Sequence, residues 1–279
     1  MNFKKIASIL SVIVVTGLII YGYILYRDIF GANTKFSENE VYVYIPTDAT
    51  YDEVKNIVAP YIKDMSRFEM VATKKSYPER SDKSGRFLLK KGMNSNEIVN
   101  SLRLNVPVNL AFNNQERLEN FAGRIGSQIE ADSLSLLDAF RDKKFLEENG
   151  FTEENVLSMF VPNSYEFFWN TSAVKFRDRM AKEYRKFWTN DRLEKAKQLN
   201  LTPIQVSILA SIVHKETVKR DERPRVAGVY LNRLQRGIKL EADPTVIYAV
   251  KLKSGDFNQV IKRVLNKDLV TDSPYNTYM

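Results

Sequence analysis

Val41-Tyr-Val-Tyr-Ile45 is an extended apolar segment, and a short turn separates it from Thr50 and Glu53. Thr followed by Glu at this spacing is a capping box, in which each side chain accepts a hydrogen bond from the other residue's backbone N–H at the start of a helix. The apolar residues that follow have helical spacing: Val54, Ile57, Val58 and Tyr61. The segment therefore predicts a strand that leads into an amphipathic helix.

The same order of strand, turn, capping residue and helix recurs twice downstream. The second copy has its apolar segment at 87–89 and pairs Asn94 with Glu97, and the third has its segment at 106–110 and pairs Asn113 with Glu116. Strand-plus-helix units of this length are typical of a small α+β module. We place that module at residues 41–105, after a polar linker at 27–40.

From Ser133 onward the sequence is mainly helical, so the predicted fold class is α+β, with a mostly helical α+β domain at 106–279. Helices are predicted at 133–149, 174–188, 202–219 and 222–236. The expected buried positions are Leu134, Leu137, Phe140 and Phe145 in the first of these helices, and Val226, Val229, Tyr230 and Leu234 in the last, which Gly237 ends. The segment 159–169 is rich in aromatic and turn residues, so it either lines a cleft or fills a core.

Leu209-Ala-Ser-Ile-Val-His-Lys-Glu-Thr217 places a lone carboxylate on an apolar helix face. At about 100° per residue, Glu216 points between the directions of Leu209, Ile212 and Val213. A glutamate there costs free energy unless a cation pairs with it or it stays protonated. Glu216 is therefore either a buried ion-pair partner or a general acid. His214 points about 160° away and is expected to face solvent.

The N-terminus has the pattern of a membrane anchor. Residues 6–26 carry no charge, Lys4 and Lys5 precede them, and tyrosines cluster at the far end. This length spans a bilayer as a helix, and the basic residues before it favour a cytoplasmic N-terminus at 1–5 with the rest of the chain outside. The alternative is a cleaved signal peptide, although no A-x-A cleavage site follows the apolar run.

Composition narrows the possible chemistry. The 279-residue chain has no cysteine and one histidine, which excludes disulfides, thiol catalysis and a multi-histidine metal site. Catalysis is left to carboxylates, tyrosines and lysines. The net charge of +8 suits an anionic membrane surface or polymer, or is simply a solvated basic surface. Nucleic acid is a poor fit, because no basic-aromatic motif supports it.

Four motifs resemble, in order and spacing, those of the YceG-like family. They are Ala210-Ser-Ile-Val-His-Lys-Glu-Thr217, Val226-Ala-Gly-Val-Tyr-Leu-Asn-Arg-Leu234, Ala242-Asp-Pro-Thr-Val-Ile-Tyr248 and Pro274-Tyr-Asn-Thr-Tyr278. The N-terminal span, the segment Pro162-Asn-Ser-Tyr-Glu166 and the module at 41–105, which looks LysM-like, also fit. The likeness covers nearly the whole chain.

The resemblance implies a single-pass enzyme of the bacterial inner membrane that faces the cell wall and acts beside glycan-polymerising penicillin-binding proteins. Such enzymes are lytic transglycosylases, which cut nascent peptidoglycan strands between N-acetylmuramic acid and N-acetylglucosamine and leave a 1,6-anhydro end. Ordinary glycosidases need two carboxylates. One suffices here, because the sugar's own C6 hydroxyl is the nucleophile. The implied catalytic residue is Glu216, with no metal or cofactor.

The resemblance also implies a set of substrate-binding residues: Asp243, Thr245, Tyr275, Asn276 and Glu166. Arg233 is expected to pair with Glu222 or Asp243. Relatives continue past the position of Tyr278 with a Gly-Leu-Pro-Pro-Gly-like segment, so the catalytic domain is expected to be incomplete at Met279. Two alternatives to the enzyme stay open: a membrane-anchored peptidoglycan-binding module and an inactive scaffold for wall-synthesis proteins.

Overall fold

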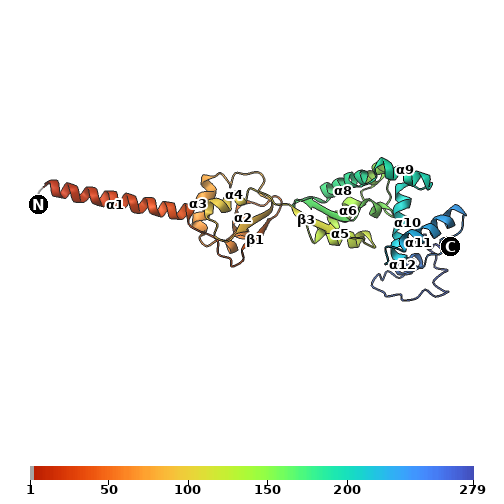
Figure 1. Ribbon diagram of the computed structural model, residues 1–279. Helices are drawn as coiled ribbons and strands as arrows, with labels where there is room; N and C mark the ends of the chain where they lie inside the picture. Colours follow the sequence, from red (N-terminus) through yellow and green to blue (C-terminus); the bar gives the residue numbers. More distant parts are fainter. Residues whose placement is uncertain (1–2) are drawn as a thin grey trace. The chain divides into compact units, whose positions relative to one another are not determined.

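The chain folds into two compact units (Figure 1). The computed structural model describes residues 3–279, except for the side chains of residues 3–9, 25 and 28. Unit 1 holds the residues up to Lys143 together with Pro162–Asp178. Unit 2 holds Lys144–Val161 and Arg179–Met279.

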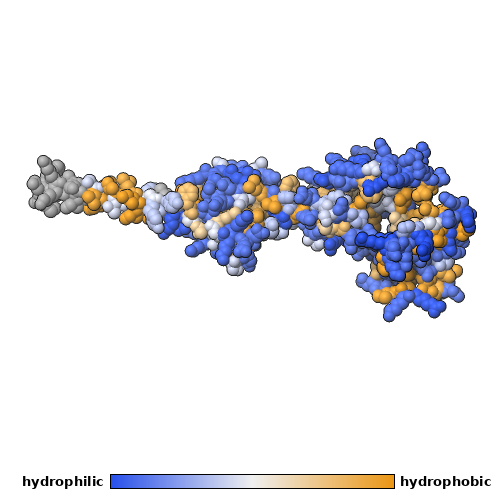
Figure 2. All heavy atoms as spheres, in the orientation of Figure 1, coloured by the Kyte–Doolittle hydropathy of each residue, from blue (hydrophilic) through white to orange (hydrophobic). Residues whose placement is uncertain are grey.

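The N-terminal helix α1 (Phe3–Phe30) contains the predicted membrane span at 6–26, part of whose side chains lie outside the described residues. Many of the side chains that are described are apolar and exposed, such as Ile13 and Ile19, and Figure 2 shows hydrophobic surface over part of this helix. Over the described part of the chain, no helix combines the length and the hydropathy expected of a bilayer crossing.

The predicted α+β module begins with β1 and ends with α4. Its elements are β1 (Glu40–Ile45), α2 (Tyr51–Val58), the 3-10 helix η1 (Ala59–Tyr61), α3 (Met65–Lys74), β2 (Gly85–Lys90) and α4 (Ser95–Ser101). The two strands pair antiparallel, with Val43 opposite Phe87. The capping boxes at Thr50 and Asn94 form as predicted, so local side-chain chemistry starts both α2 and α4.

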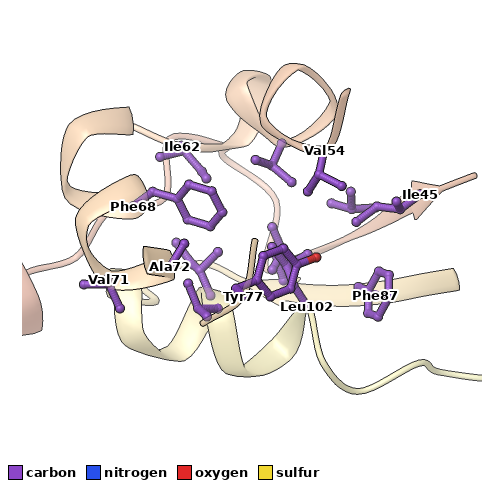
Figure 3. Packing of buried hydrophobic residues seen from close by; sticks show 14 residues of the cluster. Ile45, Val54, Ile62, Phe68, Val71, Ala72, Tyr77, Phe87 and Leu102 are labelled. Atoms are coloured by element: carbon purple, nitrogen blue, oxygen red, sulfur yellow. The ribbon is translucent and has the colours of Figure 1, made fainter. Parts of the chain in front are cut away.

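A single hydrophobic core holds this module together. Both strands and the helices α2, α3 and α4 contribute side chains that point into it, as Figure 3 shows for Val54, Phe68 and Leu102. All three are fully buried, and each such side chain stabilises the fold by about 1.5–3 kcal/mol relative to an exposed one. The residues of this core lie between Val43 and Leu102.

The rest of unit 1 contains a second antiparallel pair of strands. β3 (Val108–Phe112) pairs with β4 (Asn163–Phe167), and these strands are accompanied by α5 (Leu118–Gly126) and α6 (Ser133–Phe140). β4 lies within the aromatic segment 159–169, and its Tyr165 stacks on Phe112 with ring centroids 5.6 Å apart. Met159, Phe160 and Phe167 are buried whereas Phe168 is 51% exposed, so only part of this segment fills a core.

Three predictions for the segment 106–149 are wrong. The third capping box does not form: β3 continues to Phe112, and α5 begins after Arg117, which caps it without a side-chain bond. The helix predicted at 133–149 is two helices, α6 and α7 (Lys143–Asn149). Leu134 is 71% exposed, because α6 buries the face that carries Leu136 and Phe140 instead.

A chain of amide and hydroxyl bonds joins the module to the rest of unit 1. Asn105 accepts a hydrogen bond from the backbone N–H of Arg86 at 3.1 Å and donates one to Asn170 at 3.0 Å, and Asn170 donates to Ser84 at 2.7 Å. Gly85 lies against this chain at φ 139°, where an added Cβ would come within 2.5 Å of the Asn105 side chain. This position therefore requires glycine.

Unit 2 is helical. It contains η2 (Val156–Met159), α9 (Asn190–Gln198), α10 (Pro203–Glu216), α11 (Arg223–Gln235) and α12 (Asp243–Ser254), and α8 (Ala173–Phe187) enters it from unit 1. The sequence predicted α8 correctly and placed the end of α11 at Gly237, whose φ of 64° fits a helix stop. Val229 and Leu234 were expected to be buried, yet they are 49% and 43% exposed.

Candidate active site

The candidate site begins where α10 ends. The capping box of Thr202 and Gln205 starts this helix, with Pro203 in its first turn, as predicted. The helix ends at Glu216, earlier than the predicted Lys219, because Thr217 adopts an extended backbone. Leu209 and Val213 are buried as expected.

Glu216 itself is exposed, so its expected burial on the apolar face is wrong. Because the helix ends at this residue, its side chain lies just beyond the buried face of α10 and not within it. His214 is exposed, as expected. Partial loss of hydration and the positive charges of Arg223 and Lys215 lower the pKa of His214 below its ordinary value.

Tyr230 is the neighbour of Glu216 on α11. It is 6% exposed and packs in a cluster with side chains of α10 and with Ala242. Burial first, and then the charge of Glu216 and a hydrogen bond to it, raise the pKa of Tyr230 to about 12. The phenol therefore stays protonated at neutral pH, and its O–H can donate to the Glu216 carboxylate.

A second phenol lies close to this site. The hydroxyl of Tyr278 donates a hydrogen bond of 2.7 Å to Oδ1 of Asp243, the first residue of α12. This bond is the main cause that raises the pKa of Tyr278 to about 12, and the charge of Glu216 is a smaller cause. We refer to Glu216, Tyr230, Asp243 and Tyr278 as the Glu216 cluster.

Thr277 fastens the C-terminal segment 273–279 to the start of α12. Its hydroxyl accepts a hydrogen bond from the backbone N–H of Ala242 at 3.0 Å and lies 2.9 Å from the hydroxyl of Thr245. The Thr245 hydroxyl also lies 2.7 Å from the carbonyl of Ala242, to which it donates. The Thr245 hydroxyl is thus engaged in this local network, and its predicted contact with substrate stays a prediction.

Asn276 and Tyr275 lie in the same segment. Asn276 is 6% exposed and donates hydrogen bonds to the carbonyls of Leu269 and Thr271, at 2.9 and 2.8 Å. The ring of Tyr275 packs edge-on against Tyr248, with centroids 4.8 Å apart, and burial raises its pKa. These contacts shape the segment that carries Tyr278, and the predicted substrate contacts of Asn276 and Tyr275 stay predictions.

The ion pairs differ from those expected. Arg233 pairs with Glu241 at 3.1 Å and donates to the carbonyl of Leu240 at 2.6 Å, instead of pairing with Glu222 or Asp243. Glu222 pairs with Lys219 at 3.2 Å, three residues before it. Arg233 therefore braces the turn that leads into α12.

Glu166 lies on β4 in unit 1 with an exposed side chain, whereas the Glu216 cluster lies in unit 2. Unit 1 also contains a cavity of about 1050 Å³, lined by parts of 47–49, 81–84, 130–142 and 170–177. No residue of the Glu216 cluster lines it.

Sequence reasoning missed both tyrosines of the cluster as functional candidates. Tyr230 was taken only as a core position, although a buried tyrosine usually needs a partner for its hydroxyl, and that signal pointed to a nearby acceptor. Tyr278 meets Asp243 across 35 residues of sequence, a contact that no local pattern gives.

The cluster contains two carboxylates, which can give and take protons, and two phenols, which donate hydrogen bonds. This combination suits acid–base work on a neutral polar substrate. Within the residues that the structure describes, no group of three or more His, Cys, Asp or Glu side chains is placed to hold a metal ion.

Segments of this chain are similar to two known proteins that have the same name. A 70-residue segment is 44% identical to the endolytic murein transglycosylase of Bacillus subtilis and covers 25% of this chain and 18% of that protein. An 84-residue segment is 37% identical to the enzyme of the same name from Streptococcus pneumoniae and covers 29% of this chain and 14% of that one. The matches thus span less than a fifth of either relative's length.

The fold has a counterpart among solved structures. The crystal structure of a YceG-like protein from Listeria monocytogenes superposes with a TM-score of 0.54 at 23% identity, over 87% of this chain and 83% of that one. The model of the YceG-like family matches residues 43–279, which include most of the module and the whole Glu216 cluster. The chain therefore belongs to the YceG-like family.

Proposed function

We propose that this protein is an endolytic lytic transglycosylase of peptidoglycan. The single observation that carries the proposal is the Glu216 cluster, in which one carboxylate at the end of α10 has a phenol donor beside it and a second carboxylate–phenol pair nearby. Family membership and the names of the relatives support the same activity.

The proposed reaction needs one acid–base group. Glu216 in its protonated form gives its proton to the glycosidic oxygen as the bond between that oxygen and C1 of N-acetylmuramic acid breaks. The resulting carboxylate then takes the proton from the C6 hydroxyl of the same sugar, whose oxygen forms the new bond to C1. The products are a 1,6-anhydro end and a free N-acetylglucosamine hydroxyl, and no water is consumed.

In this proposal the remaining residues of the site bind the glycan. Asp243 accepts hydrogen bonds from sugar hydroxyls or N-acetyl groups, and its exposed position at the start of α12 supports this role. Tyr230 keeps the Glu216 carboxylate in one orientation while it changes protonation state, since a hydrogen bond from a buried side chain restricts the rotamers of an exposed one.

The location of the protein is part of the proposal. We infer that α1 anchors the chain in the bacterial inner membrane, with the two units on the outer side next to glycan-polymerising penicillin-binding proteins. The exposed apolar side chains of α1 support this inference, as does the net charge of +8 at an anionic membrane surface. If residues 1–30 are deleted, the protein should move from the membrane fraction to the soluble fraction, and unchanged membrane association would contradict the anchor.

A binding module without activity is the second candidate, and one observation favours it. The cavity of about 1050 Å³ lies in unit 1 and is lined by residues outside the Glu216 cluster, so unit 1 could hold a glycan strand without cutting it.

Substitution of Glu216 separates the two candidates. We expect Glu216→Gln to abolish release of fragments from uncrosslinked glycan strands, because an amide can neither donate the proton nor accept it. Binding of the strands should change little, since the amide keeps the size and polarity of the side chain. Glu194→Gln, on α9, is the matched control for an exposed carboxylate outside the cluster. If Glu216→Gln keeps full turnover, Glu216 is not the acid.

A further inference from the structure

The contact between Tyr278 and Asp243 has two features that point to a purpose beyond folding. Asp243 is exposed, and a free carboxylate at such a position samples several rotamers. The Tyr278 hydroxyl reaches its Oδ1 at 2.7 Å, the length of a strong hydrogen bond to a charged acceptor. One such bond selects a single orientation of the carboxylate.

The segment that carries Tyr278 is held without help from this phenol. Thr277 receives a hydrogen bond from the backbone N–H of Ala242 and contacts the hydroxyl of Thr245, and its carbonyl accepts a bond of 3.1 Å from the N–H of Glu241. The N–H of Tyr278 itself donates to the side chain of Asn276 at 3.0 Å. The phenol–carboxylate bond therefore adds little to the backbone placement, and it chiefly fixes the Asp243 side chain.

We propose that Tyr278 is a positioning residue for glycan binding, which holds Asp243 with Oδ1 occupied so that Oδ2 is presented to a sugar hydroxyl or an N-acetyl N–H. The inference rests on the proposed function, because it assigns the recognition step of that same site. It also gives the two phenols different roles: Tyr278 acts on binding through Asp243, whereas Tyr230 acts beside Glu216.

The choice of ligand atoms follows from the chemistry of the pair. A carboxylate accepts hydrogen bonds and does not donate them when ionised, so it recognises O–H and N–H groups. A murein strand presents both kinds of donor on each disaccharide. Because the pKa of Tyr278 is raised to about 12, its phenol remains a donor over the whole physiological pH range.

A double-mutant cycle tests this role. The four proteins are wild type, Tyr278→Phe, Asp243→Asn and the double variant, assayed for kcat and KM on uncrosslinked glycan strands. We expect Tyr278→Phe to raise KM about threefold to tenfold, the effect of one hydrogen bond, with kcat within about twofold of wild type. In the Asp243→Asn background, the same substitution should change KM by less than about twofold, because its target is already altered.

Two controls identify a merely structural effect. Tyr184→Phe makes the same chemical change on α8, where the ring packs between Phe151 and Trp188, and it should leave both kinetic constants unchanged. Thermal unfolding of Tyr278→Phe should match wild type closely. If Tyr278→Phe raises KM by the same factor with and without the Asp243→Asn substitution, it does not act through Asp243 and the inference is wrong.

The outcome also separates this inference from the proposed function. Strand binding by the Glu216→Gln protein, measured as Kd by fluorescence anisotropy with and without Tyr278→Phe, reports recognition with no turnover. An unchanged Kd on adding Tyr278→Phe overturns the inference alone. A wild-type protein that neither cuts nor binds the strands overturns the proposed function, and the inference falls with it.

Discussion

At the scale of single residues, the environment of Glu216 is set by hydrogen-bond donors that come from other elements. Tyr230 reaches it from α11, and the charge of Glu216 is felt by Tyr278 from the C-terminal segment. Two protonated phenols among carboxylates limit the repulsion between like charges, because each phenol donates to an anion without adding charge of its own.

His214 gives a residue-scale prediction that follows from its neighbours. Partial loss of hydration and the charges of Arg223 and Lys215 disfavour its protonated form, so its pKa lies below the ordinary 6.5. For a base whose pKa is lower in the folded state, the contribution to stability is complete above the unfolded pKa and declines as the pH falls below it. We expect the imidazole to titrate below 6.5 and Arg223→Ala to raise its midpoint.

The measurement is simple because this is the only histidine of the chain. Its ring proton resonance can be followed by NMR as the pH is lowered, without further assignment. Arg223→Lys keeps the positive charge and is the matched control, which should leave the midpoint near that of wild type. A wild-type midpoint at or above 6.5 would show that the neighbouring charges do not act on His214.

At the scale of helices and strands, the sequence predicted an element correctly when the residues that determine it lie close together in the chain. The capping boxes at Thr50 and Thr202 place both partners within one helical turn, so the sequence alone was enough to predict the starts of α2 and α10. The third box failed because β3 extends to Phe112 by pairing with β4, about fifty residues downstream. The pairing of β3 with a distant strand therefore outweighed the local capping pattern of the third box.

The candidate site, too, was predicted only as far as local sequence patterns allow. Helical register alone singled out Glu216 as an unusual carboxylate, although it placed the residue within the apolar stripe instead of at its end. The contact between Tyr278 and Asp243 joins the C-terminus to α12, and no periodicity or spacing reports such a contact. The ion pair of Arg233 was wrong for a related reason, since its partner Glu241 lies in an irregular turn.

Mutation can compare a predicted capping box that forms with one that does not. Thr50→Ala removes a formed cap and should lower the free energy of unfolding by about 1 kcal/mol. Asn113→Ala changes a residue of the same predicted motif that caps no helix, so its effect should stay within about 0.5 kcal/mol. Urea unfolding followed by circular dichroism measures both. Equal losses in the two variants would contradict the assignment of caps.

At the scale of the whole molecule, the chain separates its tasks between its units. Unit 1 has the core of the α+β module, the paired strands β3 and β4 and the cavity, whereas unit 2 has the complete Glu216 cluster. Glu166, predicted to contact substrate, belongs to unit 1, and its contact with substrate stays a prediction.

The central claim is that Glu216 drives a cut in which the sugar's C6 hydroxyl, and not water, attacks C1. Mass spectrometry of the fragments that wild-type protein releases from uncrosslinked glycan strands tests this most directly, because an anhydro end is lighter than a reducing end by one water. The account predicts 1,6-anhydro-muramic ends with wild type and no fragments with Glu216→Gln. Reducing ends from wild type, or anhydro ends from Glu216→Gln, would contradict it.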